Sequence, residues 1–134
     1  MAVPKQIAAV MMAVALLAGC ATTQRTDLYF GRNIPGGGQV TEQQWKAFSD
    51  SILTPAFSGG YTETDAQGKW LDPGIGKTIT EDTKVVTVIG KRSAKRNKQL
   101  NRVTEAYINR FNQQAVLRVD GKVRQWFIMK KAIN

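Results

Sequence analysis

The sequence predicts an α+β fold built around one antiparallel sheet. Two segments, residues 41–54 and 97–112, carry apolar side chains at helical spacing. Between them, residues 83–89 (TKVVTVI) are β-branched and largely apolar, as expected of a central strand. The chain of 134 residues is long enough for one domain and leaves little room for a second.

The domain is predicted to open with a strand and a capped helix. In residues 27–31 (DLYFG), alternation places Leu28 and Phe30 on one face of a strand. After a glycine-rich loop, Thr41 and Gln44 have the spacing of a capping box, in which each side chain binds the backbone N–H group of the other residue. We therefore expect a helix to begin directly after Thr41.

This first helix has one apolar stripe. Trp45, Phe48 and Ile52 are spaced i, i+3 and i+7, so they lie on the same side of a helix. Pro55 has no backbone N–H and disfavours a helical conformation in the residue before it. The helix is therefore predicted to end near Thr54.

Three strand segments are predicted between the two helices. Residues 61–65 and 69–71 are expected to form two short strands around a glycine-containing turn. The loop at residues 72–76 (DPGIG) then leads into the central strand at residues 83–89.

The second helix is predicted over residues 97–112. A start earlier in the chain would turn Arg96 toward the apolar side, so Asn97 is the expected N-cap. The apolar stripe of this helix consists of four side chains at spacings of three and four, namely Leu100, Val103, Tyr107 and Phe111.

The C-terminal part of the domain is predicted to be a hairpin. Residues 116–119 and 123–128 are expected to pair around a type I′ turn at Asp120-Gly121. The order then reads β-α-β-β-α-β, for which the simplest packing is a ferredoxin-like sandwich with both helices on one face of the sheet. Its core is expected to contain Trp45, Phe48, Val86, Val88, Leu100, Val103 and Tyr107.

The first twenty residues have the pattern of a lipoprotein signal peptide. Lys5 supplies a positive charge, and residues 7–18 form an apolar run that is shorter than the roughly 20 residues needed to span a bilayer. The LAGC motif ending at Cys20 resembles the lipobox of bacterial lipoproteins, in which the Cys receives a diacylglycerol and becomes the first residue after cleavage. An ordinary secretory signal with a chance Cys is the alternative, but Cys20 is the only Cys in the chain. We predict a signal peptide over residues 1–19 and lipidation of Cys20.

The anchor also predicts a location. Two or three acyl chains hold a protein on a membrane stably, whereas one chain does not. By resemblance to enterobacterial lipoproteins, Ala21 after the Cys implies the outer membrane, with the protein facing the periplasm. Residues 20–26 are predicted to be a short acylated tether, and residues 27–134 a single α+β domain that lies close to the membrane.

Several short motifs, in a fixed order, resemble a family of small secreted or lipid-anchored bacterial proteins known as domain of unknown function three-five-seven-four. The resemblance covers about residues 27–120 and implies an exported, single-domain α+β protein, with no assigned activity and no catalytic residues to transfer. The motifs are FGR at 30–32, GGG at 36–38, VTEQQW at 40–45 with Phe48, TPAF at 54–57, DAQGKW at 65–70, Ser93, YINRF at 107–111 and VLRV at 116–119.

Composition and spacing exclude several classes of site. The chain has no His, which removes Ser-His and Cys-His hydrolysis and the commonest zinc ligand, and one Cys cannot form an internal disulfide. The GIGKT segment at 74–78 lacks the first Gly of a phosphate-binding loop, and the Gly36–Gly38 loop lacks the third Gly of a dinucleotide site. We predict no metal, no cofactor and no catalytic residue, although a glycosidase carboxylate pair is left open because only its spatial separation would reveal it.

Positive charge is concentrated in the C-terminal third. Residues 90–134 contain 12 basic and 2 acidic residues, whereas residues 20–89 contain 6 basic and 8 acidic residues. Cations before a helix N-terminus oppose the helix dipole, and a bound anion would reverse that effect and use the free N–H groups. A solvated face is the competing explanation. The predicted anion-binding cluster consists of Lys91, Arg92, Lys95, Arg96, Lys98 and Arg102.

These observations favour a non-enzymatic lipoprotein of the cell envelope that presents a basic surface to anionic lipid, lipopolysaccharide or another envelope polymer. Nucleic acid is not expected as a partner, because the protein is predicted to be exported and the cluster has no aromatic residue to stack a base. The alternative is a small-molecule-binding protein or enzyme with a pocket on the open sheet face, completed by a dimer. The candidates for lining such a pocket are Tyr29, Arg32, Tyr61, Trp70 and Arg118.

Overall fold

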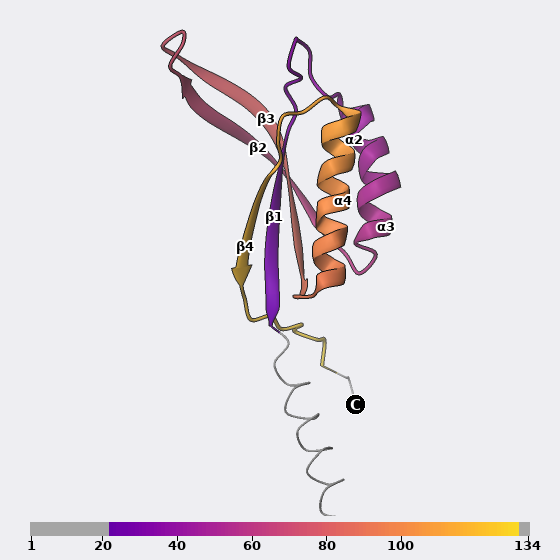
Figure 1. The fold of residues 1–134 in the computed structure, drawn as a ribbon. Helices are drawn as coiled ribbons and strands as arrows, with labels where there is room; N and C mark the ends of the chain where they lie inside the picture. The colour runs from indigo at the N-terminus through magenta and orange to yellow at the C-terminus, as the bar shows by residue number, and fades with distance from the viewer. Residues whose placement is uncertain (1–21, 132–134) are drawn as a thin grey trace, which may run out of the picture.

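The computed structural model describes residues 22–131 as a four-stranded antiparallel sheet with its helices against one face (Figure 1). The predicted signal peptide and Cys20 lie outside the described residues. No helix within the described part of the chain has both the length and the apolar character to cross a membrane. The elements are β1 (Thr23–Gly31), α2 (Glu42–Phe48), the π-helix η1 (Ser49–Leu53), α3 (Thr54–Ala56), β2 (Thr62–Asp72), β3 (Lys77–Lys91), α4 (Ala94–Arg110) and β4 (Leu117–Lys122).

The strands are arranged in the order β2-β3-β1-β4. Every neighbouring pair is antiparallel, with Leu28 of β1 opposite Val86 of β3 on one side and opposite Arg118 of β4 on the other. Since β1 and β2 both run antiparallel to β3, they are parallel to each other with β3 between them. The α+β class and the antiparallel sheet are therefore as predicted.

The core lies between the sheet and the helices. Leu28 and Phe30 project from β1 and Val86 and Val88 from β3, all toward the helices, because alternate residues of a strand share a face. All seven side chains predicted for the core are buried. Within residues 22–131, every buried residue lies between Gln24 and Phe111, so a chain that begins at Ala21 keeps the entire described core.

The first helix starts as predicted and ends later than predicted. The capping box of Thr41 and Gln44 is present in full. Beyond Phe48 the helix widens, and the N–H of Thr54 donates to the carbonyl of Ser49, five residues back. The wider turn makes room for the Pro55 ring, which would clash with a carbonyl in a regular α-helix, so the helical path continues into α3.

The two short strands predicted at 61–65 and 69–71 are one continuous strand, β2. Its partner β3 begins at Lys77, six residues before the apolar run at residues 83–89 from which the central strand was predicted. All residues of β2 pair with β3. The outer parts of both strands are largely exposed, carry polar side chains together with the apolar Trp70 and Leu71, and form a ribbon that extends beyond the core (Figure 1). Backbone pairing holds this ribbon together, which is why hydrophobic alternation did not reveal it.

Helix α4 begins before the predicted cap. Ser93 is the N-cap, and its hydroxyl accepts a hydrogen bond from the N–H of Arg96. Asn97 is therefore inside the helix. The early start turns Arg96 toward the apolar side of the helix, contrary to the prediction, and its guanidinium lies against the end of β3.

The hairpin predicted after residue 119 is absent, and residues 120–122 continue β4. Strand β1 begins at Thr23, inside the predicted tether, so it supplies backbone partners for this continuation, with Thr26 opposite Asp120 and Gln24 opposite Lys122. The Thr26 hydroxyl also donates to the Asp120 carboxylate at 2.6 Å. Residues 123–131 form no helix or strand.

Candidate anion-binding cleft

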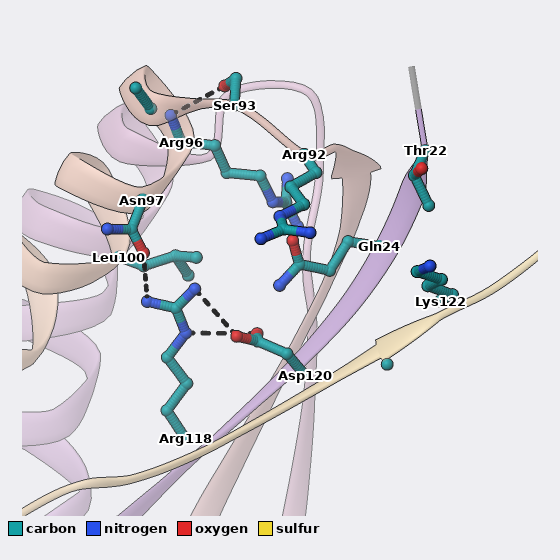
Figure 2. Close-up of a pocket in the computed structure, with 12 residues that line it drawn as sticks. Thr22, Gln24, Arg92, Ser93, Arg96, Asn97, Leu100, Arg118, Asp120 and Lys122 are labelled. Carbon is teal, nitrogen blue, oxygen red and sulfur yellow. Dashed lines mark hydrogen bonds and ion pairs between the residues drawn. The ribbon is translucent and has the colours of Figure 1, made fainter. Parts of the chain in front are cut away.

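A cleft of about 740 Å³ opens where the first turn of α4 meets the ends of β1 and β4. Four basic side chains, Arg92, Arg96, Arg118 and Lys122, and one carboxylate, Asp120, line it. Figure 2 shows Arg92 and Arg96 reaching into the cleft from the start of α4, and Arg118 and Asp120 from β4. We call this site the basic cleft. It lies on the helix side of the sheet, which differs from the pocket expected on the open face.

Arg96 is a partly buried cation of the basic cleft. Its Nη2 donates to the carbonyl of Val88 at 2.9 Å, and its buried Nε has no hydrogen-bond partner among the described residues. Burial lowers the pKa of Arg96, the neighbouring charge of Arg118 lowers it further, and Asp120 acts in the opposite direction. An anion in the cleft would offset both unfavourable contributions.

Arg118 is held in place by its neighbours. It donates to Asn97 Oδ1 at 2.8 Å and forms an ion pair with Asp120 at 3.0 Å. Burial alone would raise the pKa of the Asp120 carboxyl, but hydrogen bonds from Thr26 and Arg118 keep that pKa below its ordinary value. The Asp120 carboxylate is thus ionised and forms its ion pair with Arg118. Arg92, Arg96 and Lys122 therefore have no ion pair with an acidic residue within the basic cleft.

The start of α4 adds backbone donors to these charges. The first N–H groups of a helix have no intrahelical acceptor and carry partial positive charge. Ser93 caps the N–H of Arg96, whereas Ala94 lines the cleft in the first turn. The arrangement is suited to holding a phosphate or carboxylate group.

The structure divides the six cations predicted as one cluster. Arg92 and Arg96 line the basic cleft. Lys91 and Lys95 border a separate groove beside Phe57–Gly60, which Arg96 also reaches. Lys98 and Arg102 are exposed along α4 and line neither cavity. Of the six cations predicted as one cluster, only Arg92 and Arg96 therefore line the basic cleft.

Two cations of the basic cleft, Arg118 and Lys122, were absent from the predicted cluster. Arg118 was named only as a candidate for a pocket on the open face. The signal for both is the alternation of Arg118, Asp120 and Lys122, which places them on one face of a strand. That signal was hidden by the hairpin predicted to start at Asp120.

The other pocket candidates lie elsewhere. Arg32 pairs with Glu42 at 2.6 Å, and the Tyr61 hydroxyl is 2.8 Å from the Ser49 hydroxyl. Tyr29 is on the open sheet face, and Trp70 is exposed on the β2–β3 ribbon. None of these four pocket candidates lines the basic cleft.

A second polar group surrounds η1. Ser49 hydrogen-bonds to Tyr61 and Glu63, Thr54 binds the same Tyr61 hydroxyl, and Trp45 donates to Glu63 at 3.3 Å. These hydrogen bonds connect the π-helix to Tyr61 and to Glu63 at the start of β2. Within residues 22–131, no three acidic, His or Cys side chains are placed to hold a metal ion.

Comparison with solved structures identifies similar folds. A phage SAM lyase in complex with S-methyl-5'-thioadenosine has a TM-score of 0.57 at 14% sequence identity, covering 75% of this chain and 81% of the other. The same lyase in its apo state gives a TM-score of 0.56 at 14% identity, covering 76% and 81%. At this identity the similarity concerns the fold alone.

Comparison at the level of sequence is more specific. No curated protein matches the chain. One family model, described as "Protein of unknown function (DUF3574)", matches residues 25–127, which is most of the chain and includes nearly all of the described domain. The resemblance noted from the short motifs is confirmed, and the chain belongs to the DUF3574 family.

Proposed function

We propose that this protein is a lipid-anchored component of the bacterial cell envelope whose basic cleft binds an anionic group, such as the phosphate of a lipid headgroup or of lipopolysaccharide. The observation that carries the proposal is the convergence of Arg92, Arg96, Arg118 and Lys122 on one cleft with a single carboxylate. The buried, unpartnered Nε of Arg96 adds a donor that an anion would satisfy.

The position of the cleft relative to the predicted anchor supports this proposal. Thr22 borders the basic cleft, and two peptide units connect it to Cys20. Two Cα steps span at most about 8 Å. Acyl chains on Cys20 would therefore hold the cleft beside the headgroups, within the distance over which charges act at physiological salt, about 8 Å.

The anchor is tested by mass spectrometry of the mature N-terminus. We expect the first residue to be Cys20 carrying acyl chains, and we expect Cys20→Ser to abolish the modification and leave an uncleaved precursor or a soluble product. A mature protein that begins elsewhere, or that carries an unmodified Cys20, would contradict the anchor.

The basic cleft is tested by co-sedimentation with vesicles, using the chain that begins at Ala21. Near an anionic surface each Lys or Arg contributes on the order of 1 kcal/mol. Arg92→Glu combined with Lys122→Glu should therefore weaken binding to anionic vesicles at least about thirtyfold. Binding of the wild type should itself weaken steeply as salt rises.

The matched control is Lys98→Glu combined with Arg102→Glu. It changes the net charge by the same amount on the exposed side of α4, outside the basic cleft. We expect it to weaken binding far less. Equal losses of binding in the two double variants, or equal binding of the wild type to neutral and anionic vesicles, would contradict the proposal. The charged residues would then be an ordinary solvent-exposed surface.

The fold is best described as ferredoxin-like, and we propose this from the arrangement of strands. The order along the chain is β-α-β-β-α-β. β1 and β3 occupy the two central positions, so each β-α-β unit is split by a strand of the other unit. Both helices cover the same face, as the predicted sandwich requires (Figure 1).

A small-molecule-binding protein that uses the same cleft is the second candidate. The cleft volume lies within the range of about 300–1,000 Å³ that is typical of ligand sites. The two candidates differ in thermal denaturation. A rise in melting temperature with S-methyl-5'-thioadenosine, and none with inorganic phosphate, would favour the second candidate over an anion site.

A further inference from the structure

The segment that follows β4, residues 123–131, leaves the sheet beside the start of β1. The N–H of Val123 donates to the carbonyl of Thr23 at 3.1 Å, which is the last backbone contact with the sheet. Beyond it the chain passes the end of the sheet at which β1 begins and forms no helix or strand (Figure 1). We call residues 123–131 the C-terminal segment.

Four consecutive large apolar side chains of this segment are exposed. Trp126, Phe127, Ile128 and Met129 are 74%, 84%, 94% and 78% exposed. Single exposed apolar residues are ordinary on protein surfaces, but a contiguous group marks a site of interaction with another apolar phase or partner. Basic residues flank the group on both sides, at Arg124, Lys130 and Lys131.

The C-terminal segment starts at the same end of the domain as the predicted anchor. Thr22 accepts a hydrogen bond from the N–H of Arg92 at 2.9 Å, and Thr23 pairs with Lys91. A shallow groove joins Thr22 and Thr23 to residues 122–126. Three features therefore lie at the same end of the domain. They are the start of the described chain at Thr22, the first turn of α4 and the exposed apolar group.

We propose that the C-terminal segment is a second membrane contact, in which residues 126–129 enter the interface between headgroups and acyl chains. The proposal rests on the anchoring stated above, because Cys20 would hold this end against the bilayer. Trp and other aromatic residues are favoured at that depth. The flanking cations match the anionic headgroups, and stable attachment of a protein to a membrane generally combines two such signals.

Another exposed apolar group, at the tip of the β2–β3 ribbon, serves as a contrast. Trp70, Leu71 and Ile75 are also exposed there. The ribbon tip lies at the end of the sheet opposite to the start of β1 (Figure 1). Because the two exposed apolar groups lie at opposite ends of the sheet, Trp70 is a matched control for Trp126.

Quenching of tryptophan fluorescence by brominated lipid tests the proposal. The protein is isolated in its processed form from a bacterial host and combined with neutral and with anionic vesicles whose acyl chains carry bromine. We expect the emission of Trp126 to fall, because an indole at headgroup depth lies close to the brominated acyl chains. The quenched component should disappear in Trp126→Phe and persist in Trp70→Phe.

The outcomes separate this proposal from the previous one. Unquenched Trp126, together with anion-dependent binding through Arg92 and Lys122, would overturn the membrane contact and leave the basic cleft in place. Quenched Trp126 in neutral and anionic vesicles alike, without any effect of the cleft variants, would support the contact and reject the cleft. A concentration-dependent change of Trp126 emission without lipid, accompanied by dimers in sedimentation, would assign the segment to a second copy and overturn the proposal.

Discussion

Replacing Phe48 with alanine is expected to lower the free energy of unfolding by about 3–5 kcal/mol. Phe48 is fully buried at the centre of an aromatic cluster. Its ring lies 5.2 Å from that of Tyr107 and 6.0 Å from that of Phe30, measured between centroids, and the Arg110 guanidinium lies over it at 5.6 Å. The substitution would leave a cavity between α2, α4 and β1 that rigid neighbours cannot fill. Urea denaturation of the chain from Ala21 measures the loss.

Phe127→Ala is the matched control for this prediction. The same side chain is removed there from a position that is 84% exposed, so the free energy of unfolding should change by less than about 0.5 kcal/mol. A loss below about 1 kcal/mol for Phe48→Ala, or equal losses for the two variants, would show that the aromatic cluster is not the core of the domain.

The second large effect is alkaline destabilisation through Tyr107. Its hydroxyl donates to the carbonyl of Gly31 at 2.8 Å, and burial raises the pKa of this tyrosine above its ordinary value. The hydroxyl therefore stays protonated in the folded protein, while it ionises in the unfolded chain above about pH 10. The stability that depends on the neutral form is fully present below that pH and is lost as the pH rises. The expected slope is about 1.4 kcal/mol per pH unit.

Tyr107→Phe isolates this contribution. Near neutral pH the variant should be less stable by roughly 1–3 kcal/mol, because the partly buried carbonyl of Gly31 loses its donor. Above about pH 10 the difference should shrink, since only the wild type carries the ionisable group. Parallel pH profiles for the two proteins, measured by urea denaturation, would contradict a buried neutral hydroxyl at this position.

Elements with a signal contained in a few neighbouring residues could be predicted from the sequence. The capping box at Thr41, the apolar stripe of Trp45 and Phe48, and the buried valines of β3 all appear in the structure as expected. Each depends on spacing along the chain, because capping is local and burial selects one face of a helix or strand. The family resemblance was likewise visible in short ordered motifs.

The basic cleft could be predicted only in part. The charge run indicated an anion site near the start of the second helix, and Arg92 and Arg96 do line it. Arg118 and Lys122 come from a strand that follows later in the sequence, and Lys98 and Arg102 point elsewhere along α4. Counting charges along the chain cannot separate these groups, because convergence depends on which strand lies beside the helix.

By itself, the sequence determined the α+β class, the core side chains, the start of the first helix and the family. The tertiary structure decided how far each strand extends and which cations meet. Asp120-Gly121 is a good turn sequence in isolation, yet it continues β4 because the early start of β1 places Thr26 opposite Asp120 and Arg25 opposite Gly121. The β2–β3 ribbon likewise exists because each strand supplies the other's backbone partners. Such partners are distant in sequence and become available only when the sheet forms. Backbone hydrogen bonds between strands then outweigh the turn preference of a short local sequence.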